Sequence, residues 1–411
     1  MRVVVVGGGV IGLAVAHALR RRGAEVTVVD RDRCGASASW GNTGWVTPGL
    51  AAPVPAPGVV RQALRWMLDR ESPFLVRPRL TPAFLAWCVR FWRATSEARY
   101  GDGLRATLDL ARPTTELFDA LRADGVRFEM HSDGLLYLVR SADALAGWRA
   151  MYEELAQLGF DGQVTELDGA EVRAIEPSVG DHVAAGLLAR VERHVRPETL
   201  TAGLAASLRA AGARLEEEAE VTALRPARGG WRVETRAGAI EADRAVVAAG
   251  VWTRELLAPL GLRLPFEAAK GYSITVPANG DGPRHPLYLT EIKVGVSPFE
   301  GAVRLAGTLE LAGLDLRLNR RRIDAIAAHA SAYLNGSLAH GPTVEWAGLR
   351  PLTADGLPVI GAVPGHRGLY VATGHHLLGI TLAPATAEAL APLVLEDRLV
   401  DVLRPLSPGR F

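Results

Sequence analysis

The sequence predicts an α/β fold, and three observations support this prediction. A β-branched run at the N-terminus leads into closely spaced glycines and a helical pattern, and a second apolar run of strand length follows. Apolar residues make up 48% of the chain and charged residues 22%, as is typical of globular proteins. The length of 411 residues corresponds to two or three domains. The formal net charge of +1 gives no electrostatic reason to expect nucleic acid as a partner.

The first element is a predicted strand at residues 2–6, followed by Gly7, Gly9 and Gly12 in the spacing G-x-G-x-x-G and by a helix that reaches Arg22. Gly7 allows the tight turn from strand to helix, Gly9 allows the backbone to approach a pyrophosphate, and Gly12 allows the helix to pack closely on the sheet. Free N–H groups and the positive dipole at the start of the helix attract phosphate. This segment therefore predicts a phosphate-binding turn.

The second strand, residues 24–29, ends at Asp30. An acidic side chain at this position can accept hydrogen bonds from the ribose of an adenosine, and it disfavours a 2′-phosphate. The complete pattern predicts dinucleotide binding. The alternative for the apolar run at residues 3–19 is a membrane span or a signal peptide, but that run is short for a span and no small-residue cleavage site follows it.

After Asp30 the regular alternation of strands and helices expected of a nicotinamide-dependent enzyme stops. Residues 35–44 are rich in glycine, serine and threonine instead. Such a segment can present backbone N–H groups and the hydroxyls of Ser37 and Ser39 to phosphates. The alternative is a flexible surface loop without a ligand.

Five segments carry a resemblance to a known family: GGGVIGLAVAHAL…VTVVDRD, SASWGNTG, RAVVAAGVWTREL (244–256), KGYSITVP (270–277) and WAGLRPLTADGLPVIG…GLYVATGHHLLGITLAPATAEAL (346–390). They resemble the D-amino-acid oxidase superfamily of FAD-dependent amine oxidoreductases, and within it most of all the bacterial D-amino-acid dehydrogenases. The resemblance runs the length of the chain. It implies a Rossmann-like FAD-binding domain interleaved with a mixed-sheet substrate domain that carries extra helices, α+β overall.

The domain organisation follows from the resemblance and from local patterns. The implied FAD-binding domain comprises residues 1–50, 160–262 and 346–411, and the substrate-binding domain comprises residues 51–159 and 263–345. Apolar spacing predicts helices at residues 59–70, 82–100, 103–123, 142–158, 198–211 and 378–396, and strands at 134–140, 214–224, 231–235, 245–249 and 369–373. Residues 263–310 alternate as a half-exposed sheet would. Thr81 and Pro82 suit the N-cap and the first position of a helix.

The cofactor implied by the resemblance is FAD. The expected contacts with FAD are made by Gly7, Gly9, Val10, Ile11, Gly12, Asp30, Arg31, Ser37, Ser39, Asn42, Thr43, Gly44, Val221, Ala249, Gly250, Trp252, Gly374, Leu377, Leu378, Gly379, Ile380 and Thr381. Neither cysteine, Cys34 or Cys88, lies near the C-terminal flavin segment, so we expect non-covalent FAD. Two cysteines also exclude a disulfide framework and favour a reducing, cytoplasmic location. The sequence contains no cluster of cysteines and histidines, so it predicts no structural metal site.

On the substrate side, the resemblance implies that Arg350, in the block Gly-Leu-Arg-Pro, pairs with the carboxylate of the substrate. The planar guanidinium suits this task because it donates two parallel charge-assisted hydrogen bonds. The alternative is a structural arginine in an ion pair between the domains.

Residues 374–379 follow a predicted strand and open a helix, and the resemblance places them over the isoalloxazine ring. The positive end of that helix would stabilise the negative charge of reduced flavin. The usual pattern of the family is Gly-His-Gly, but His376 follows His375 here. We expect His375 and His376 to contribute to catalysis, with a purely structural role as the alternative for either.

Two tyrosines are further candidates. Tyr272 could hydrogen-bond a carboxylate or form a wall of the pocket, and core packing is the alternative. Tyr288 is a weaker candidate on a predicted mobile loop.

The expected reaction is oxidative deamination of an amino acid, with the D-isomer favoured, to a keto acid and ammonia by hydride transfer from Cα to flavin N5. The flavin carries the redox chemistry, so the protein must position the Cα–H bond and supply the electrostatic stabilisation. The alternatives are a glycine, sarcosine or proline-type amine oxidase, a non-catalytic flavoprotein subunit of a larger complex, and a nicotinamide-linked dehydrogenase.

One segment bears on the electron acceptor, which is either a quinone of the respiratory chain or oxygen. Residues 59–93 contain seven arginines against Asp69 and Glu71, with Trp66, Trp87 and Trp92 among them. Basic helices with tryptophan can lie on an anionic membrane, which would make the protein peripheral at the inner face of the membrane. The alternative is a pair of amphipathic helices packed on the substrate domain. The sequence favours no oligomeric state.

Overall fold

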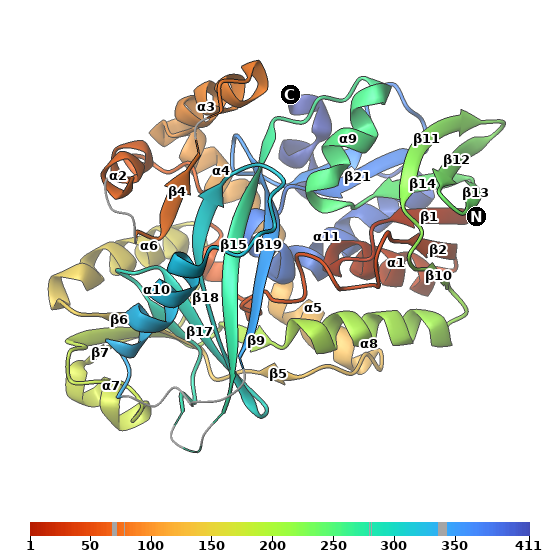
Figure 1. Ribbon diagram of the computed structural model, residues 1–411. Coiled ribbons are helices and arrows are strands. Elements are labelled where there is room, and N and C mark those ends of the chain that lie inside the picture. Colours follow the sequence, from red (N-terminus) through yellow and green to blue (C-terminus); the bar gives the residue numbers. More distant parts are fainter. Residues whose placement is uncertain (68–71, 78, 279, 281, 336–342) are drawn as a thin grey trace.

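The structure is a computed structural model that describes residues 1–67, 72–77, 79–278, 280, 282–335 and 343–411. Two large sheets dominate it, and each sheet combines segments that are distant in the sequence (Figure 1).

The first large sheet has six strands in the order β10 (Arg214–Glu216), β2 (Glu25–Val29), β1 (Arg2–Val6), β14 (Arg244–Val247), β21 (Leu369–Thr373) and β20 (Val359–Ala362). All neighbours are parallel except β20 and β21. The N-terminal apolar run is thus a central strand and the helix α1 (Val10–Arg21), not a membrane span.

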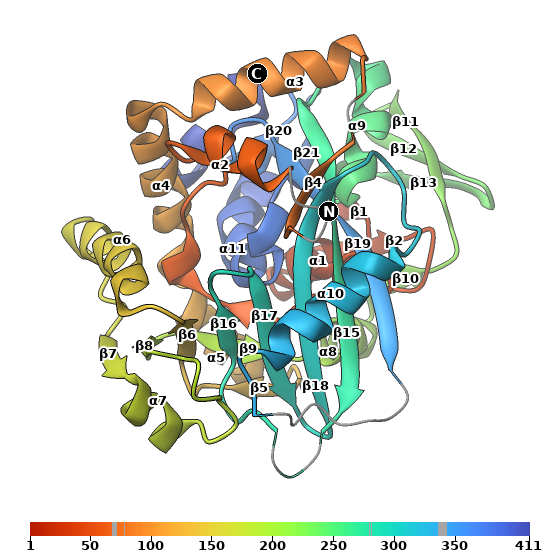
Figure 2. The ribbon, with the colours of Figure 1, turned by 60° about the vertical axis from the view of Figure 1, so that its left-hand side comes forward.

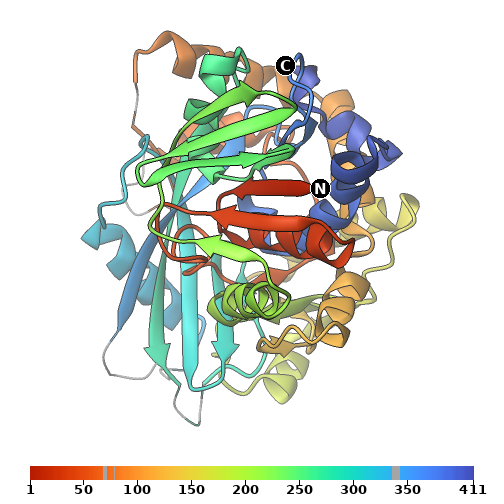
Figure 3. The same ribbon diagram turned by 90° about the vertical axis from the view of Figure 1, so that its right-hand side faces the viewer.

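Alternation along β1 divides the core into two layers. Val3 and Val5 pack with the helices α1, α8 (Pro197–Ala210) and α11 (Gly379–Glu396), whereas Val4 and Val6 pack with the small sheet β11 (Val221–Ala227), β12 (Gly230–Thr235) and β13 (Gly238–Ala242). Successive side chains of a strand point to opposite faces, so one valine-rich strand serves both layers. Figure 3 shows the six-stranded sheet between these layers.

The second large sheet has nine strands. Its order is β19 (Val344–Thr353), β15 (Phe266–Pro277), β18 (Ala302–Leu311), β17 (Val294–Phe299), β16 (Leu287–Leu289), β6 (Leu135–Val139), β8 (Ala185–Ala189) and β7 (Val164–Asp168), and β4 (Phe74–Val76) pairs with β18. Helix α10 (Arg320–Ser331) packs on one face of this sheet (Figure 2).

The remaining helices are α2 (Val59–Trp66), α3 (Pro82–Ala94), α4 (Glu97–Ala111), α5 (Thr114–Ala123), α6 (Leu145–Gln157), α7 (Gly169–Ile175) and α9 (Thr253–Leu257). A small sheet of β3 (Trp45–Val46), β9 (Arg193–Val195) and β5 (Met130–His131) joins distant segments. Thr81 caps α3 as predicted, because its hydroxyl accepts from the N–H of Phe84 and Pro82 takes the first helical position.

Several predicted boundaries differ from the observed ones. The helix predicted at 82–100 is two helices, α3 and α4, and the strand predicted at 214–224 is two strands, β10 and β11. Strand β8 pairs with β6, β7 pairs with β8, and β19 pairs with β15, so the sheets do not divide at residues 160 and 346. These pairings join segments far apart in the sequence, which local patterns do not reveal. The last residues of the helix predicted at 59–70 lie outside the described residues.

Among the described residues, one helical segment, His376–Glu396, is long and apolar enough to cross a membrane. In the folded protein, 78% of the most apolar stretch of this segment is buried. The burial results from packing of α11 against α1 and other helices. A core helix is the simpler interpretation.

Candidate active site

The glycine-rich turn connects the carboxyl end of β1 to α1. Gly7 has φ +110°, and a Cβ on it would lie 2.5 Å from the carbonyl oxygen of Ala248. A Cβ on Gly12 would overlap the carbonyl oxygen of Gly7, whereas a Cβ on Gly9 would contact only the hydroxyl of Ser39. The turn therefore excludes side chains at its base and keeps an open surface at Gly9, which is the arrangement that a pyrophosphate requires.

Asp30 closes the neighbouring strand β2 beside this turn. Its carboxylate accepts hydrogen bonds from the N–H of Gly8 at 2.6 Å and of Asp32 at 2.8 Å. Burial raises the pKa of Asp30, and these two hydrogen bonds oppose that shift. The next residue, Arg31, lies with its guanidinium 3.6 Å from the ring centre of Trp252.

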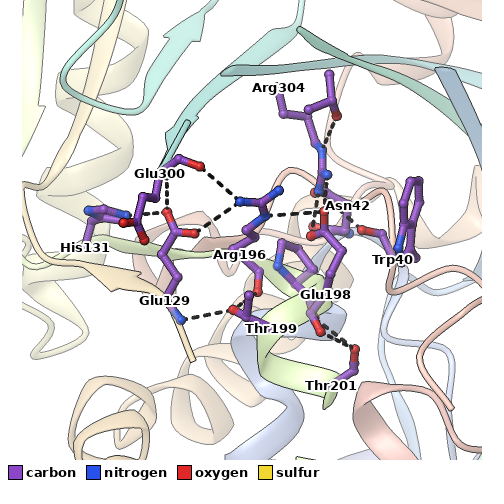
Figure 4. A network of polar contacts seen from close by, with 12 residues as sticks. Trp40, Asn42, Glu129, His131, Arg196, Glu198, Thr199, Thr201, Glu300 and Arg304 are labelled. Atoms are coloured by element: carbon purple, nitrogen blue, oxygen red, sulfur yellow. Dashed lines mark hydrogen bonds and ion pairs between the residues drawn. The ribbon is translucent and has the colours of Figure 1, made fainter. Parts of the chain in front are cut away.

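The segment at residues 37–44 is held from both sides. The hydroxyl of Ser39 accepts from the N–H of Val10 at 3.0 Å. From the nine-stranded sheet, Arg304 donates to the carbonyl oxygens of Asn42 at 2.9 Å and Trp40 at 3.3 Å (Figure 4). The interpretation of this segment as a flexible surface loop is therefore not supported.

Arg304 is itself fixed by a network of polar contacts. It is 1% exposed, donates to the hydroxyl of Thr275 at 2.9 Å and forms an ion pair with Glu198 at 2.5 Å. Glu198 also lies 3.7 Å from Arg196, which in turn lies 3.6 Å from Glu129 (Figure 4). Two arginines and two carboxylates thus balance each other at the junction of β18, α8 and the segment at 37–44.

These elements surround a cavity of about 410 Å³. The predicted site residues that line it are Gly7, Gly9, Val10, Ile11, Asp30, Arg31, Ser37, Ser39, Asn42, Val221, Ala249, Gly250, Trp252, Arg350, His375, His376, Gly379 and Ile380. Segments from the beginning, the middle and the C-terminal part of the sequence therefore meet at one site.

Other predicted contacts do not line the cavity. They are Gly12, Thr43, Gly44, Gly374, Leu377, Leu378, Thr381 and Tyr272. The carbonyl of Thr43 accepts from Ser297, and Leu377 is 50% exposed. Thr381 donates to the carbonyl of Trp45 and accepts from the N–H of Thr47, so it ties the chain at residues 45–47 to α11.

Further lining residues were not predicted: Val6, Val29, Ala38, Glu220, Thr222, Arg236, Ala248, Glu255, Leu256, Leu349, Pro351, Ala372 and Thr373. Several of them stand at the carboxyl ends of β1, β2, β14 and β21, where ligands of parallel sheets bind, so the predicted strands themselves could have identified them. Glu220, Thr222 and Arg236 come from the small sheet and its flank, and no sequence signal marks them.

A buried carboxyl group, that of Glu192, lies outside the lining of the cavity. Glu192 accepts from the N–H of Gly49 at 2.9 Å and from the hydroxyl of Tyr152 at 3.3 Å, and its Oε2 has no partner among the described residues. Burial raises the pKa of Glu192 to about 8. The group is therefore largely protonated at neutral pH.

Arg350 on β19 lies over Gly271 of the neighbouring strand β15. A Cβ on Gly271 would come closer than 3.0 Å to three atoms of the guanidinium, so only glycine leaves room for it. Nη1 donates to the carbonyl of Thr308 at 3.4 Å, and Arg350 forms no ion pair with any described residue. Burial lowers its pKa to about 10. A half-buried cation in a cavity, without an anion among the described residues, is the feature expected of a carboxylate-binding site.

His375 and His376 are both buried at the start of α11. Nε2 of His375 lies 3.0 Å from the hydroxyl of Thr386, and burial lowers the pKa of His375 to about 3. Nε2 of His376 donates to the carbonyl of Gly356, which leaves Nδ1 as an acceptor without a partner among the described residues. Burial lowers the pKa of His376 to about 4, so both rings are neutral at neutral pH.

The role of Tyr272 in substrate binding is not supported. Tyr272 and Gly271 are neighbours on β15, so their side-chain positions face opposite sides of the sheet. The Tyr272 side chain is fully buried, packs in the core with α10, and donates to Glu310 at 2.7 Å. Tyr288 lies in strand β16 rather than in a mobile loop, and its ring contacts the rings of Trp45 and Trp148.

The residues around the cavity fit FAD. The glycine turn leaves the backbone open at Gly9, the carboxylate of Asp30 lines the cavity beside this turn, and His376 Nδ1 offers a buried acceptor without a partner among the described residues. Neither Cys34 nor Cys88 lines the cavity, and burial raises the pKa of Cys34 to about 12, which leaves it as an unreactive thiol. Among the described residues, no group of His, Cys, Asp and Glu side chains could hold a metal ion.

The fold and this cavity define a dinucleotide-dependent enzyme with a half-buried cation in the lining of its cavity. The chain belongs to the DAO family of FAD dependent oxidoreductases, whose family model matches residues 2–393. The resemblance stated from the sequence and the prediction of FAD are both confirmed.

Two curated relatives align with almost the whole chain. It is 35% identical to a D-amino acid dehydrogenase of Cereibacter sphaeroides, over 100% of this chain and 97% of that protein. It is 34% identical to a D-amino acid dehydrogenase of Rhodopseudomonas palustris, over 99% and 95%. Among solved structures, glycine oxidase from Geobacillus kaustophilus has a TM-score of 0.79 at 24% identity, with 100% of this chain and 99% of that chain covered. At this level of identity, the likeness to that structure shows a shared fold.

Proposed function

We propose that this FAD-dependent oxidoreductase deaminates a D-amino acid oxidatively, to a keto acid and ammonia. The observation that carries the proposal is Arg350, a half-buried guanidinium that lines the cavity and forms no ion pair with a described residue. An α-amino acid brings the carboxylate that this cation lacks. The preference for the D-isomer comes from the two relatives named D-amino acid dehydrogenase, which match the full chain.

The residues of the chain divide the work. Arg350 binds the substrate carboxylate through two parallel hydrogen bonds and so fixes the orientation of the Cα–H bond. His375 and His376 are neutral, so they add no positive charge that would repel the substrate amino group. Bound FAD would supply the acceptor for the hydride that leaves Cα. The resulting imine then hydrolyses in water.

We further propose that FAD is held without a covalent bond, by the predicted contacts that line the cavity. The ribose is assigned to Asp30, and the pyrophosphate to the backbone of Gly9 and Val10 and to the hydroxyls of Ser37 and Ser39. The start of α11 is assigned to the isoalloxazine ring. Release of intact FAD on denaturation, with colourless protein left behind, is the expected result, and yellow denatured protein would contradict it.

Anaerobic flavin bleaching tests the reaction. Addition of D-amino acids should reduce the flavin, whereas L-isomers and N-methyl amino acids should not. Bleaching by glycine, sarcosine or L-proline alone would favour an amine oxidase of that type, and no bleaching by any amine would favour a non-catalytic flavoprotein subunit. Replacement of Arg350 by Met should raise the half-saturating substrate concentration by at least ~100-fold, since two charge-assisted hydrogen bonds are lost.

For the second half of the reaction we propose a quinone of the membrane as electron acceptor, and a cytoplasmic enzyme that reaches it from the inner face. The word dehydrogenase in the names of the relatives supports an acceptor other than oxygen. Re-oxidation of bleached enzyme by a soluble quinone analogue should be much faster than by air. Equal or faster re-oxidation by air would assign oxygen instead.

A further inference from the structure

A second cation without an anion lies at the nine-stranded sheet, at Lys293. Lys293 directly precedes β17 and is half-buried. Its Nζ lies 5.3 Å from the ring centre of Trp148 on α6 and 5.6 Å from that of Tyr288 on β16. Lys293 forms no ion pair with a described residue, whereas the other lysine of the chain, Lys270, pairs with Glu310 at 3.7 Å. Two aromatic faces, and no carboxylate, thus surround this ammonium group.

The position of Lys293 is costly for the fold in two ways. Its backbone has φ +54°, a left-handed conformation that residues other than glycine seldom adopt. Burial lowers the pKa of its ammonium group. Glu291, the carboxylate that opposes this shift, is exposed and accepts instead from the N–H of Arg140 and the hydroxyl of Tyr333. Backbone strain and an unbalanced charge in one place are typical of a site that binds a ligand.

The guanidinium of Arg350 and the ring of Trp45 cover the same face of the nine-stranded sheet. Strands β17, β18 and β15 lie side by side (Figure 2), and Gly295 on β17 and Ser273 on β15 pair with the same residue of β18. Residues in such a row point to one face of the sheet, and Gly271, two positions from Ser273, shares that face. A Cβ on Gly295 would meet the ring of Trp45, and a Cβ on Gly271 would meet the guanidinium of Arg350.

Lys293 lies beside the same face. The ring of Tyr288 contacts the ring of Trp45, with 5.3 Å between their centres, and Nζ of Lys293 lies over the ring of Tyr288. Because β17 and β15 are both antiparallel to β18, Lys293 and Gly271 are displaced from the shared row in the same direction. Two strand spacings, roughly 10 Å in total, separate these two positions. Lys293 and Arg350 are therefore two unpaired cations on one side of the sheet.

From these observations we infer that the substrate is an acidic amino acid, with glutamate favoured, whose α-carboxylate binds Arg350 and whose side-chain carboxylate binds Lys293. In extended glutamate the two carboxylate carbons lie roughly 5 Å apart, by ordinary bond lengths, and each ion pair adds up to ~4 Å. The molecule therefore spans the gap between the cations, whereas a monocarboxylic amino acid leaves Lys293 unpaired. The faces of Trp148 and Tyr288 suit its methylene groups. The inference rests on the proposed oxidation of a D-amino acid and adds the class of substrate.

Anaerobic flavin reduction by D-glutamate and by D-glutamine tests the inference, since D-glutamine has the same shape but no charge on its side chain. The apparent dissociation constant should be at least ~10-fold lower for D-glutamate, as expected for a hydrogen bond between charged groups. Equal constants, or tighter binding of D-glutamine, would overturn the inference and leave the proposed function intact. Failure of the proposed function has a different result, because neither amino acid would then reduce the flavin.

Equilibrium binding tests the pair of cations without catalysis. Glutarate has both carboxylates and no amino group, and its monoamide lacks one of the two charges. Binding of each to the FAD-loaded protein is followed by the change in the absorption spectrum of the oxidised flavin. Glutarate should bind at least ~10-fold more tightly than the monoamide. Equal binding of the two would contradict the inference even if no amino acid reduced the flavin.

Matched variants assign the preference to Lys293. In Lys293→Met the ratio of the dissociation constants of D-glutamine and D-glutamate should fall to about one, and Lys293→Arg should restore a preference for D-glutamate. The control Arg140→Met removes an exposed arginine that forms no ion pair with a described residue, and it should keep the ratio of the parent. An unchanged ratio in Lys293→Met, or an equal loss in the control, would refute the assignment. Flavin content and thermal midpoint are measured for every variant, so a folding defect is recognised.

Discussion

The room left by Gly271 should determine how well the enzyme holds its substrate. In the variant Gly271→Ala, the added Cβ would come closer than 3.0 Å to Nη1, Nη2 and Cζ of Arg350, whereas ordinary contact begins at 3.4 Å. The guanidinium must therefore move by on the order of 1 Å, a misplacement that can cost ~100-fold in a reaction that depends on orientation. The clash involves the end of a flexible side chain, and Gly271 lies in an extended strand, so the fold and the bound FAD should be retained.

Rapid-mixing flavin reduction measures this effect. The rate is followed against the concentration of the best amino acid substrate, which gives the apparent dissociation constant and the limiting rate separately. Gly147→Ala is the control, because a Cβ at Gly147 in α6 meets nothing within 4 Å. If Gly271→Ala matches the control in both constants while Arg350→Met does not, Gly271 does not position Arg350. If Arg350→Met also matches, Arg350 does not bind the carboxylate.

Three further predictions concern the surroundings of the site. Arg304→Met removes the donor to the carbonyls of residues 40 and 42 and leaves Glu198 without its closest cation. The dissociation constant of FAD, measured by titration of the apoprotein, should therefore rise at least ~10-fold. An unchanged constant would show that the segment at 37–44 holds its shape without this arginine. Gly12→Ala should yield protein without flavin, because the added methyl overlaps the Gly7 carbonyl, and normal flavin content would refute the close packing of α1 on β1. Glu192 has a pKa of about 8 in the folded protein, above its value in the unfolded chain. Folding therefore takes up a proton between about pH 4.5 and 8. As a result, the free energy of unfolding falls as pH rises through that range. Urea titrations should show a smaller loss from pH 6 to 8 for Glu192→Gln than for the parent, by on the order of 2 kcal/mol, and equal losses would mean that Glu192 is ionised in the folded protein.

The parts that could be predicted from the sequence are those specified by neighbouring residues. The turn at Gly7, Gly9 and Gly12 needs only a strand before it and a helix after it, and the cap at Thr81 needs only the next three residues. The position of Arg350 in the cavity was predicted from its family block rather than from any local pattern. For the glycine turn and the helix cap, the neighbouring residues contain the physical cause, whereas the placement of Arg350 rests on the resemblance alone.

The parts that could not be predicted depend on strands that meet only in space. Gly271 and Tyr272 are adjacent in the sequence, and which of them faces Arg350 depends on the register of β15 against β19. The role of Arg304 depends on the approach of β18 to the segment at 37–44. The pairing of strands on the two sides of residue 160 depends on such a meeting too, since β7 joins its sheet through β8.

The order of strands in the six-stranded sheet also has a consequence for synthesis of the protein. Strand β1 emerges first from the ribosome, but its neighbour β14 follows more than two hundred residues later, and β21 more than a hundred residues after that. Until then β1 can pair only with β2 on one side, its other edge is unpaired, and the N-terminal segment is exposed to wrong partners. Arg350 and the two histidines arrive in the same late stretch. A nascent chain that ends before about residue 375 should therefore carry no flavin, and cells that make this enzyme should need chaperone protection for the segment of β1 until β14 and β21 have been made.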